Sequence, residues 1–194
     1  MKYKSYKGWY KIINTQKFIK PLDEYMESTV FKDGNLFIQY KSKLEYIAFR
    51  FADLNPKIVK FSVEPFNIKY IKPLDNKEHR YYIDLFLEFQ TGEKFLVEVK
   101  SKAETHPPKK PKSFNARTAN NYKTALETYI VNTAKWKAAK SFAELNNMNF
   151  LILTEDELKW YLKLLFKIFL SILYIRKLKK FFYYVIQNNK KVIT

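Results

Sequence analysis

Residues 80–100 read RYYIDLFLEFQTGEKFLVEVK, two alternating apolar stretches on either side of Thr91-Gly92. Alternation with a period of two is typical of β-strands, and Thr91-Gly92 is a turn signal, so this segment predicts a hairpin. Burying the apolar face of both strands on one side requires Leu85 to lie opposite Val99. That register predicts a three-residue connection at 91–93.

The second face of the predicted hairpin is charged. In this register Asp84 lies opposite Lys100, and Phe86 lies opposite Glu98. Two neighbouring carboxylates repel each other unless positive charge lies between them, and Mg²⁺ prefers such oxygen ligands. A lysine beside the pair can orient a water molecule or stabilise developing negative charge. The pattern fits a metal site, but it equally fits a salt-bridged polar face of an antiparallel sheet.

The composition favours a polyanionic partner. The 194 residues include 36 Lys and Arg against 19 Asp and Glu, a formal net charge of +17, and 47% are hydrophobic. We therefore expect a packed core and contact with nucleic acid or an anionic membrane surface. The absence of cysteine excludes thiolate chemistry, and two histidines argue against a His-rich zinc site. The N-terminus has no apolar signal segment, so we expect the protein to stay in the compartment where it is made.

The remaining pattern predicts a mixed α/β fold in which helices cover a sheet. Ser42 and Glu45 form a capping-box pattern at the start of one helix, so Glu45 has a structural role that can coexist with a role in the site. The predicted elements are a helix over 42–54, strands over 57–61 and 65–71, a charged loop over 72–80, a helix over 118–146, a strand over 148–153 and a helix from 154.

Two further segments are basic. Residues 1–20 interleave lysines with aromatic side chains, which suits either stacking on nucleic acid or packing on the domain. Residues 101–117 contain three prolines and several cations, and they leave the strand that contains Lys100. We predict that this loop contacts DNA phosphates, although an ordinary solvated loop has the same composition. Its cations are Lys102, Lys109, Lys110, Lys112 and Arg117.

The composition changes after residue 158, because no acidic residue follows Glu157. We therefore divide the chain into a domain at 1–158 and a basic, apolar, helical extension at 159–194. The apolar run at 164–175 is shorter than the roughly 20 residues needed to span a bilayer. A helix packed on the domain or on a partner is the favoured interpretation. A helix at a membrane surface is favoured less, and a membrane span least.

The order of the charged groups is similar to that of the PD-(D/E)xK nuclease superfamily. Asp84 supplies the first acid, Glu98-Val99-Lys100 forms the E-x-K motif, and Glu45 lies on an upstream helix. Ile83 replaces the proline that precedes the aspartate in the superfamily pattern. The resemblance implies a restriction-endonuclease-like core, with a mixed central sheet flanked by helices.

Longer segments resemble the head completion nucleases of T-even-type tailed phages. They are YYIDLFLE at 81–88, VEVKSKAETHPPKKP at 97–111, YIVNTAKWKAAKSFAE at 129–144 and FLILTEDEL at 150–158. This resemblance implies a Mg²⁺-dependent deoxyribonuclease, with Mn²⁺ as a substitute. It would trim packaged DNA during head completion and head-tail joining, in the host cytoplasm or in the virion, with double-stranded DNA and phage head or neck proteins as partners.

The same resemblance implies roles for individual residues. Asp84, Glu98 and the Val99 carbonyl hold the metal, and Glu45 is a further ligand or orients the water. Lys100 positions the attacking water or steadies the phosphate, as phosphodiester hydrolysis requires. Two residues of the long helix contact the DNA backbone, namely Asn132 and Lys135.

Two other functions remain open at this point. The E-x-K core alone does not distinguish head completion from a restriction or transposase-like nuclease. A basic structural head protein that binds DNA without cutting it also fits the charge. Endonuclease or exonuclease preference, the number of metals, the oligomeric state and the role of residues 159–194 do not follow from the sequence.

Overall fold

The computed structural model describes residues 6–21 and 28–159. The predicted extension therefore lies outside the described residues except for Lys159, and the domain boundary stays a prediction. Within the described ranges, no helix is both long and apolar enough to cross a membrane. The elements are β1 (Gly8–Lys11), η1 (Thr15–Lys17), β2 (Thr29–Lys32), β3 (Asn35–Tyr40), α1 (Lys43–Leu54), β4 (Ile58–Val63), β5 (Asn67–Lys72), β6 (Lys77–Tyr82), β7 (Leu85–Phe89), β8 (Lys94–Val99), η2 (Lys102–Thr105), α2 (Ala116–Leu145) and β9 (Asn149–Leu153).

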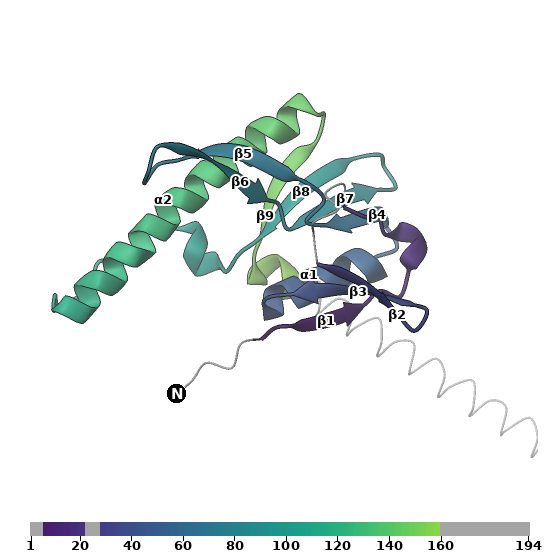
Figure 1. Cartoon of the computed structure of the whole chain (residues 1–194), viewed down its shortest axis with the longest axis horizontal. Helices are drawn as coiled ribbons and strands as arrows, with labels where there is room; N and C mark the ends of the chain where they lie inside the picture. Colours follow the sequence, from purple (N-terminus) through teal and green to yellow (C-terminus); the bar gives the residue numbers. More distant parts are fainter. Residues whose placement is uncertain (1–5, 22–27, 160–194) are drawn as a thin grey trace, which may run out of the picture. The chain divides into compact units, whose positions relative to one another are not determined.

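A four-stranded mixed sheet forms the centre of the domain. Its strand order is β4-β7-β8-β9. β4, β7 and β8 are antiparallel neighbours, whereas β9 runs parallel to β8. A parallel pair needs a long connection, and here α2 supplies it between β8 and β9 (Figure 1). The predicted mixed α/β class is confirmed.

The helix α1 covers one face of this sheet. Its N-terminus is capped as predicted, because the Ser42 hydroxyl accepts the Glu45 N–H at 3.1 Å. From the middle of α1, Phe49 enters a core cluster that also contains Leu85 and Val97 of the sheet. Leu85 of β7 and Val97 of β8 lie at the alternating apolar positions that the sequence predicted. The apolar face of the hairpin is therefore the one under α1.

The helix α2 covers the opposite face. Ala139 and Ala143 are fully buried against Leu96 of β8, in a second core cluster that includes β5 and β6. Figure 1 shows the β5-β6 pair lying across α2. The helix runs unbroken from Ala116 to Leu145, and Asn146 ends it. The second face of the hairpin is therefore covered where Leu96 packs against α2, and it is not an open face of the sheet there.

The predicted strand at 81–89 is wrong as a single element. The chain forms β6 up to Tyr82 and begins β7 at Leu85, and the two strands belong to different sheets. β6 also extends back to Lys77, into the segment predicted as a charged loop. Its pairing with β5 explains the difference, because Tyr81 lies opposite Ile68 under α2. Apolar and other residues continue to alternate through 83–84, so nothing in the sequence pattern indicates that the chain changes sheet there.

An antiparallel sheet of β1, β3 and β2 precedes α1, and it was not predicted. One aromatic of the predicted basic arm, Tyr10, packs in the core, whereas Trp9 is 45% exposed. The buried Asp53 of α1 holds this segment in place. Its carboxylate accepts hydrogen bonds from the Tyr10 hydroxyl at 2.7 Å and from the Ile13 and Asn14 N–H groups at 2.8 Å each.

The register of the β7-β8 hairpin differs from the predicted one by two residues. Leu85 pairs with Val97, not with Val99. The Phe89 N–H donates to the Glu93 carbonyl at 2.9 Å, so the loop is 90–92 instead of 91–93. Gly92 has φ +85°, which three-residue hairpin loops require at their last position. The predicted loop would have placed Glu93 there, at a steric cost that glycine avoids.

Replacing Gly92 tests this explanation. An added Cβ meets no atom within 4 Å, so Gly92→Ala changes only the backbone preference. We expect Gly92→Ala to lower the free energy of unfolding by about 1–2 kcal/mol, measured by urea denaturation. Gly92→Asn should cost less, because asparagine tolerates left-handed conformations better than alanine. Equal losses in the two variants, or none, would contradict a register fixed by Gly92.

Candidate active site

In the observed register of β7 and β8, Asp84 lies opposite Glu98. Leu85 pairs with Val97, so the preceding Asp84 and the following Glu98 lie side by side on the face under α2. The Val99 N–H donates to Asp84 Oδ2 at 2.7 Å, which fixes the aspartate at the edge of β8. The prediction that Asp84 lies opposite Lys100 is wrong. The prediction that Asp84, Glu98 and Lys100 share one face is confirmed, because a two-residue slip preserves the face.

Glu98 is bound at both carboxylate oxygens. It is only 3% exposed, and a buried carboxylate needs partners. Oε1 lies 3.1 Å from Lys100 Nζ, and Oε2 accepts a short hydrogen bond from the Tyr81 hydroxyl. The predicted E-x-K pair is therefore an ion pair in the structure. Tyr81 reaches it from β6, a strand that the sequence did not predict as separate.

Burial and charge set the protonation of this cluster. Burial raises the pKa of the Asp84 carboxyl well above its usual range, and Glu98 raises it further. Lys100 and the Val99 N–H oppose this effect only in part. For Lys100, burial lowers the pKa, but Glu98 and Asp84 outweigh burial and the net shift is upward. Asp84 and Glu98 thus repel each other at a site that lacks full neutralisation.

Glu45 lies near the pair without joining it. Its Oε2 accepts the Lys41 N–H at 2.6 Å, at the start of α1. Its charge nevertheless contributes to the raised pKa of Asp84, so the two carboxylates are close enough to interact. In the part of the chain that the structure describes, no three His, Cys, Asp or Glu side chains gather closely enough to form a ready metal cluster.

Sequence reasoning missed a second ion pair beside Asp84. Lys41 Nζ lies 2.6 Å from Glu64 Oε1, and the Glu64 N–H donates to the Asp84 carbonyl at 3.1 Å. Glu64 adopts φ +46°, an uncommon conformation for this residue type. Burial lowers the pKa of Lys41, but Glu64, Glu45 and Asp84 raise it overall. No sequence signal pointed to Lys41, because its partner Glu64 lies 23 residues away in the sequence.

The two predicted DNA-contacting residues of α2 lie on one side of the helix. Lys135 Nζ lies 5.4 Å from the centre of the Tyr81 ring and 5.9 Å from that of Tyr70. Burial lowers the pKa of Lys135, and the charges of Glu98, Lys100 and Asp84 also act on it. Lys135 therefore belongs to the electrostatic surroundings of the site. Asn132 is 7% exposed, one turn earlier on α2.

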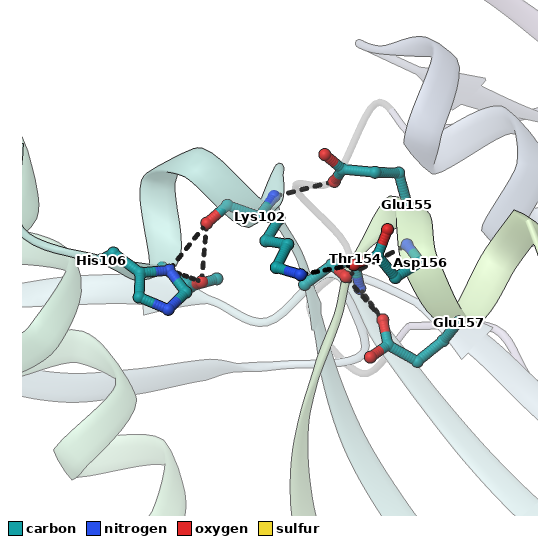
Figure 2. Close-up of polar contacts among 7 residues, drawn as sticks. Lys102, His106, Thr154, Glu155, Asp156 and Glu157 are labelled. Carbon is teal, nitrogen blue, oxygen red and sulfur yellow. Dashed lines mark hydrogen bonds and ion pairs between the residues drawn. The ribbon is translucent and has the colours of Figure 1, made fainter.

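Lys102 differs from the other cations of the basic loop because it is already paired. Figure 2 shows its backbone N–H donating to Glu155 Oε2 at 2.7 Å and its Nζ donating to Asp156 Oδ2 at 2.8 Å. The Lys102 carbonyl lies 3.0 Å from His106 Nδ1 (Figure 2). These bonds tie the loop to the residues after β9. The remaining predicted phosphate contacts are exposed, namely Lys109, Lys110, Lys112 and Arg117.

Comparison with known proteins identifies relatives of this chain. Residues 55–155 match a family model described as the N-terminal part of TnsA-like endonucleases. Over 122 residues the chain is 38% identical to the head completion nuclease of Enterobacteria phage T4. The chain belongs to this nuclease family. The alignment covers 63% of this chain and 81% of the phage protein. Asp84, Glu98 and Lys100 all lie inside the segment that matches the family model, whereas Glu45 precedes it.

Replacing the aspartate tests its electrostatic state. A carboxyl whose pKa is raised on folding favours the folded state while protonated, and this contribution is lost as the pH rises through the raised pKa. In EDTA near neutral pH, we expect Asp84→Asn to raise the melting temperature by about 2–4 °C, the shift that roughly 1 kcal/mol produces in a domain of this size. The difference should shrink on acidification. Glu88→Gln on β7, the strand that follows Asp84, is the control, and an equal gain there would contradict this account.

Removing one hydroxyl tests how Glu98 is held. Tyr81→Phe leaves Glu98 Oε2 buried without its donor, at a cost of about 1–3 kcal/mol in the free energy of unfolding. Tyr82→Phe makes the same chemical change at the neighbouring position of β6 and should cost far less. Chemical denaturation of both variants makes this comparison. Similar losses would mean that the Tyr81 hydroxyl is not a significant partner of Glu98.

Proposed function

We propose that this protein is a metal-dependent deoxyribonuclease that trims packaged DNA during phage head completion. The observation that supports it most is the arrangement of Asp84, Glu98 and Lys100. Two carboxylates lie side by side at the end of β7 and β8, and an ammonium group is paired with one of them. The relative from phage T4 is named as a head completion nuclease, which supports the biological setting.

The residues present fit a bound divalent cation. Asp84 and Glu98 offer hard oxygen donors, and burial followed by the charge of Glu98 raises the pKa of Asp84, so the two carboxylates repel each other. Mg²⁺, or Mn²⁺ in its place, would relieve this repulsion. We propose Asp84, Glu98 and the Val99 carbonyl as its ligands. Glu45 would join directly or through water after releasing the Lys41 N–H. When bound, the cation would neutralise charge on the scissile phosphate and lower the pKa of a bound water.

The protein's own groups then position the reaction. Lys100 stays protonated beside Glu98, because its pKa is raised, and it can donate to the attacking water or to a phosphate oxygen. Tyr81 holds the second oxygen of Glu98 and so keeps the first one directed at Lys100. Lys135 adds positive charge from α2 on the same side of the site.

We further propose a restriction-endonuclease-like core and double-stranded DNA as the substrate. The mixed sheet with α1 and α2 on its opposite faces supports the first proposal. The net charge of +17 supports the second, with phosphate contacts at the basic loop and at Lys135. Asn132 is buried, so we place its DNA contact in the hollows that it lines. Phage head or neck proteins as partners, and action in the host cytoplasm or the virion, follow only from the name of the relative.

A role outside virion assembly is the second candidate. The family model is that of TnsA-like endonucleases, so the same site can serve a transposase-like nuclease. The long alignment with the phage relative, over 81% of that protein, favours head completion.

Plasmid cleavage tests the proposed activity. We expect the full-length protein to nick or linearise supercoiled plasmid with Mg²⁺ and to be inactive in EDTA. Lys100→Ala should reduce the rate on the order of a hundredfold or more, the loss typical of removing one stabilising donor. Lys137→Ala, an exposed lysine of α2, is the matched control. Equal rates for wild type and Lys100→Ala would show that the proposed site does not perform the cleavage.

A thermal shift provides a readout independent of cleavage. A cation that binds only the folded protein raises its melting temperature with concentration. Mg²⁺ should therefore stabilise the wild type more than Asp84→Asn. Equal shifts in both proteins would contradict a cation site at Asp84.

A further inference from the structure

A groove runs along α2 beneath the proline-containing loop that follows Lys100. Its first hollow, of about 270 Å³, is lined mainly by apolar groups and includes Pro108, Tyr129 and Asn132. A second hollow of about 280 Å³ shares Pro108 with it and reaches Lys109. On the other flank of α2, a third hollow of about 290 Å³ includes Asn132 and Lys135. Asn132 thus lines a hollow on each side of the helix.

Asn132 is an unusual residue to find at this position. It is 93% buried, since its exposure is 7%, yet its carboxamide makes no hydrogen bond to any residue in 6–21 or 28–159. The carboxamide atoms of Asn132 are not among the fully buried polar atoms that lack a partner in the described residues, so they remain accessible from the hollows that Asn132 lines. A ligand group that offers both a donor and an acceptor would satisfy the carboxamide.

The groove begins beside the proposed active site, which is formed by Asp84, Glu98 and Lys100. Lys135 lies three residues after Asn132 on α2, about 4.5 Å along the helix. Its Nζ lies 5.4 Å from the centre of the Tyr81 ring, whose hydroxyl donates to Glu98. The opposite wall of the groove is the segment that directly continues the strand of Lys100. A DNA strand whose phosphate lies at Lys100 would therefore place its neighbouring nucleotide at this groove.

The loop wall is anchored, so the groove exists before any ligand binds. His106 lines the first hollow, and its Nδ1 is held 3.0 Å from the Lys102 carbonyl. Lys102 is in turn bound to Glu155 and Asp156 beyond β9 (Figure 2). Preformed, mostly apolar hollows with a few polar groups are typical of ligand sites.

We propose that this groove binds one unpaired nucleotide next to the scissile phosphate, so that the nuclease prefers DNA with a frayed or overhanging end. The proposal rests on the nuclease function proposed above. Tyr129 and Pro108 provide apolar surfaces for a base, and Asn132 can pair with the edge of the base. Lys109 and Lys135 lie at the outer hollows, where they can bind the flanking phosphates.

Fluorescent oligonucleotides test the proposal. The full-length protein is titrated in EDTA into short blunt duplexes and into duplexes with a single unpaired 2-aminopurine at the 3′ or the 5′ end. We expect about tenfold tighter binding to one of the overhang substrates than to the blunt duplex, with a change in 2-aminopurine fluorescence, because one stacked base supplies about that discrimination.

Variants locate the effect in the groove. Asn132→Leu and Tyr129→Ala should each lower the ratio of overhang to blunt affinity several-fold. Asn120→Leu makes the same amide-to-leucine change at an exposed position of α2 that lines none of the three hollows, and it should leave the ratio unchanged. Thermal melts show whether each variant is folded. If Asn132→Leu does not fold, Tyr129→Ala still tests the α2 side of the same hollow.

The outcomes separate this proposal from the nuclease assignment. A wild type that cuts plasmid but binds blunt and overhanging DNA equally overturns the subsite and leaves the nuclease function intact. Unchanged ratios in both groove variants also overturn it. A protein that discriminates overhangs through Asn132 and Tyr129 but never cuts DNA supports the subsite and overturns the nuclease function.

Discussion

The left-handed conformation of Gly92 is the constraint on which the site depends. A residue with φ +85° ends the hairpin loop, and this position fixes which residues of β7 and β8 face each other. Asp84 consequently lies beside Glu98 and accepts the Val99 N–H. If the loop were shifted by one residue, to 91–93, Asp84 would lie opposite Lys100. Glu98 would then lie two residues further along β8 from Asp84 and not beside it. The electrostatics of the site therefore follow from backbone geometry in a loop at the far end of the hairpin.

The sequence predicted the faces of the hairpin but not its pairing. Period-two alternation identifies which side chains share a face, and it gives the same answer for every register that differs by two residues. The face shared by Asp84, Glu98 and Lys100 was therefore predictable, as were α1 with its Ser42 cap and the class of the fold. The register required the turn to be interpreted correctly. Gly92 as the last residue of a three-residue loop was the available signal.

Other parts of the site arise from tertiary packing, which local patterns do not encode. Tyr81 reaches Glu98 because β6 pairs with β5 under α2, and an unbroken alternation through 83–84 concealed the change of sheet. The spacing of Ala139 and Ala143 on α2 predicted the buried side of that helix, whereas the role of Lys135 followed only from the resemblance. The Lys41 and Glu64 pair joins segments that are distant in sequence. By contrast, Lys102 was predicted as a DNA contact, and the structure pairs it with Asp156.

The parallel strand β9 has a consequence for the order in which the site can assemble. The hairpin of β7 and β8 is local and can form early, whereas β9 reaches β8 only after all of α2 has been made. The Lys100 N–H donates to the Leu153 carbonyl at 3.1 Å, so the backbone of the proposed catalytic lysine is fixed by this last strand. During synthesis, β8 would remain an open sheet edge with its acidic and basic groups unburied. The site is thus completed late, when nearly the whole domain has left the ribosome, and an incomplete chain would lack it.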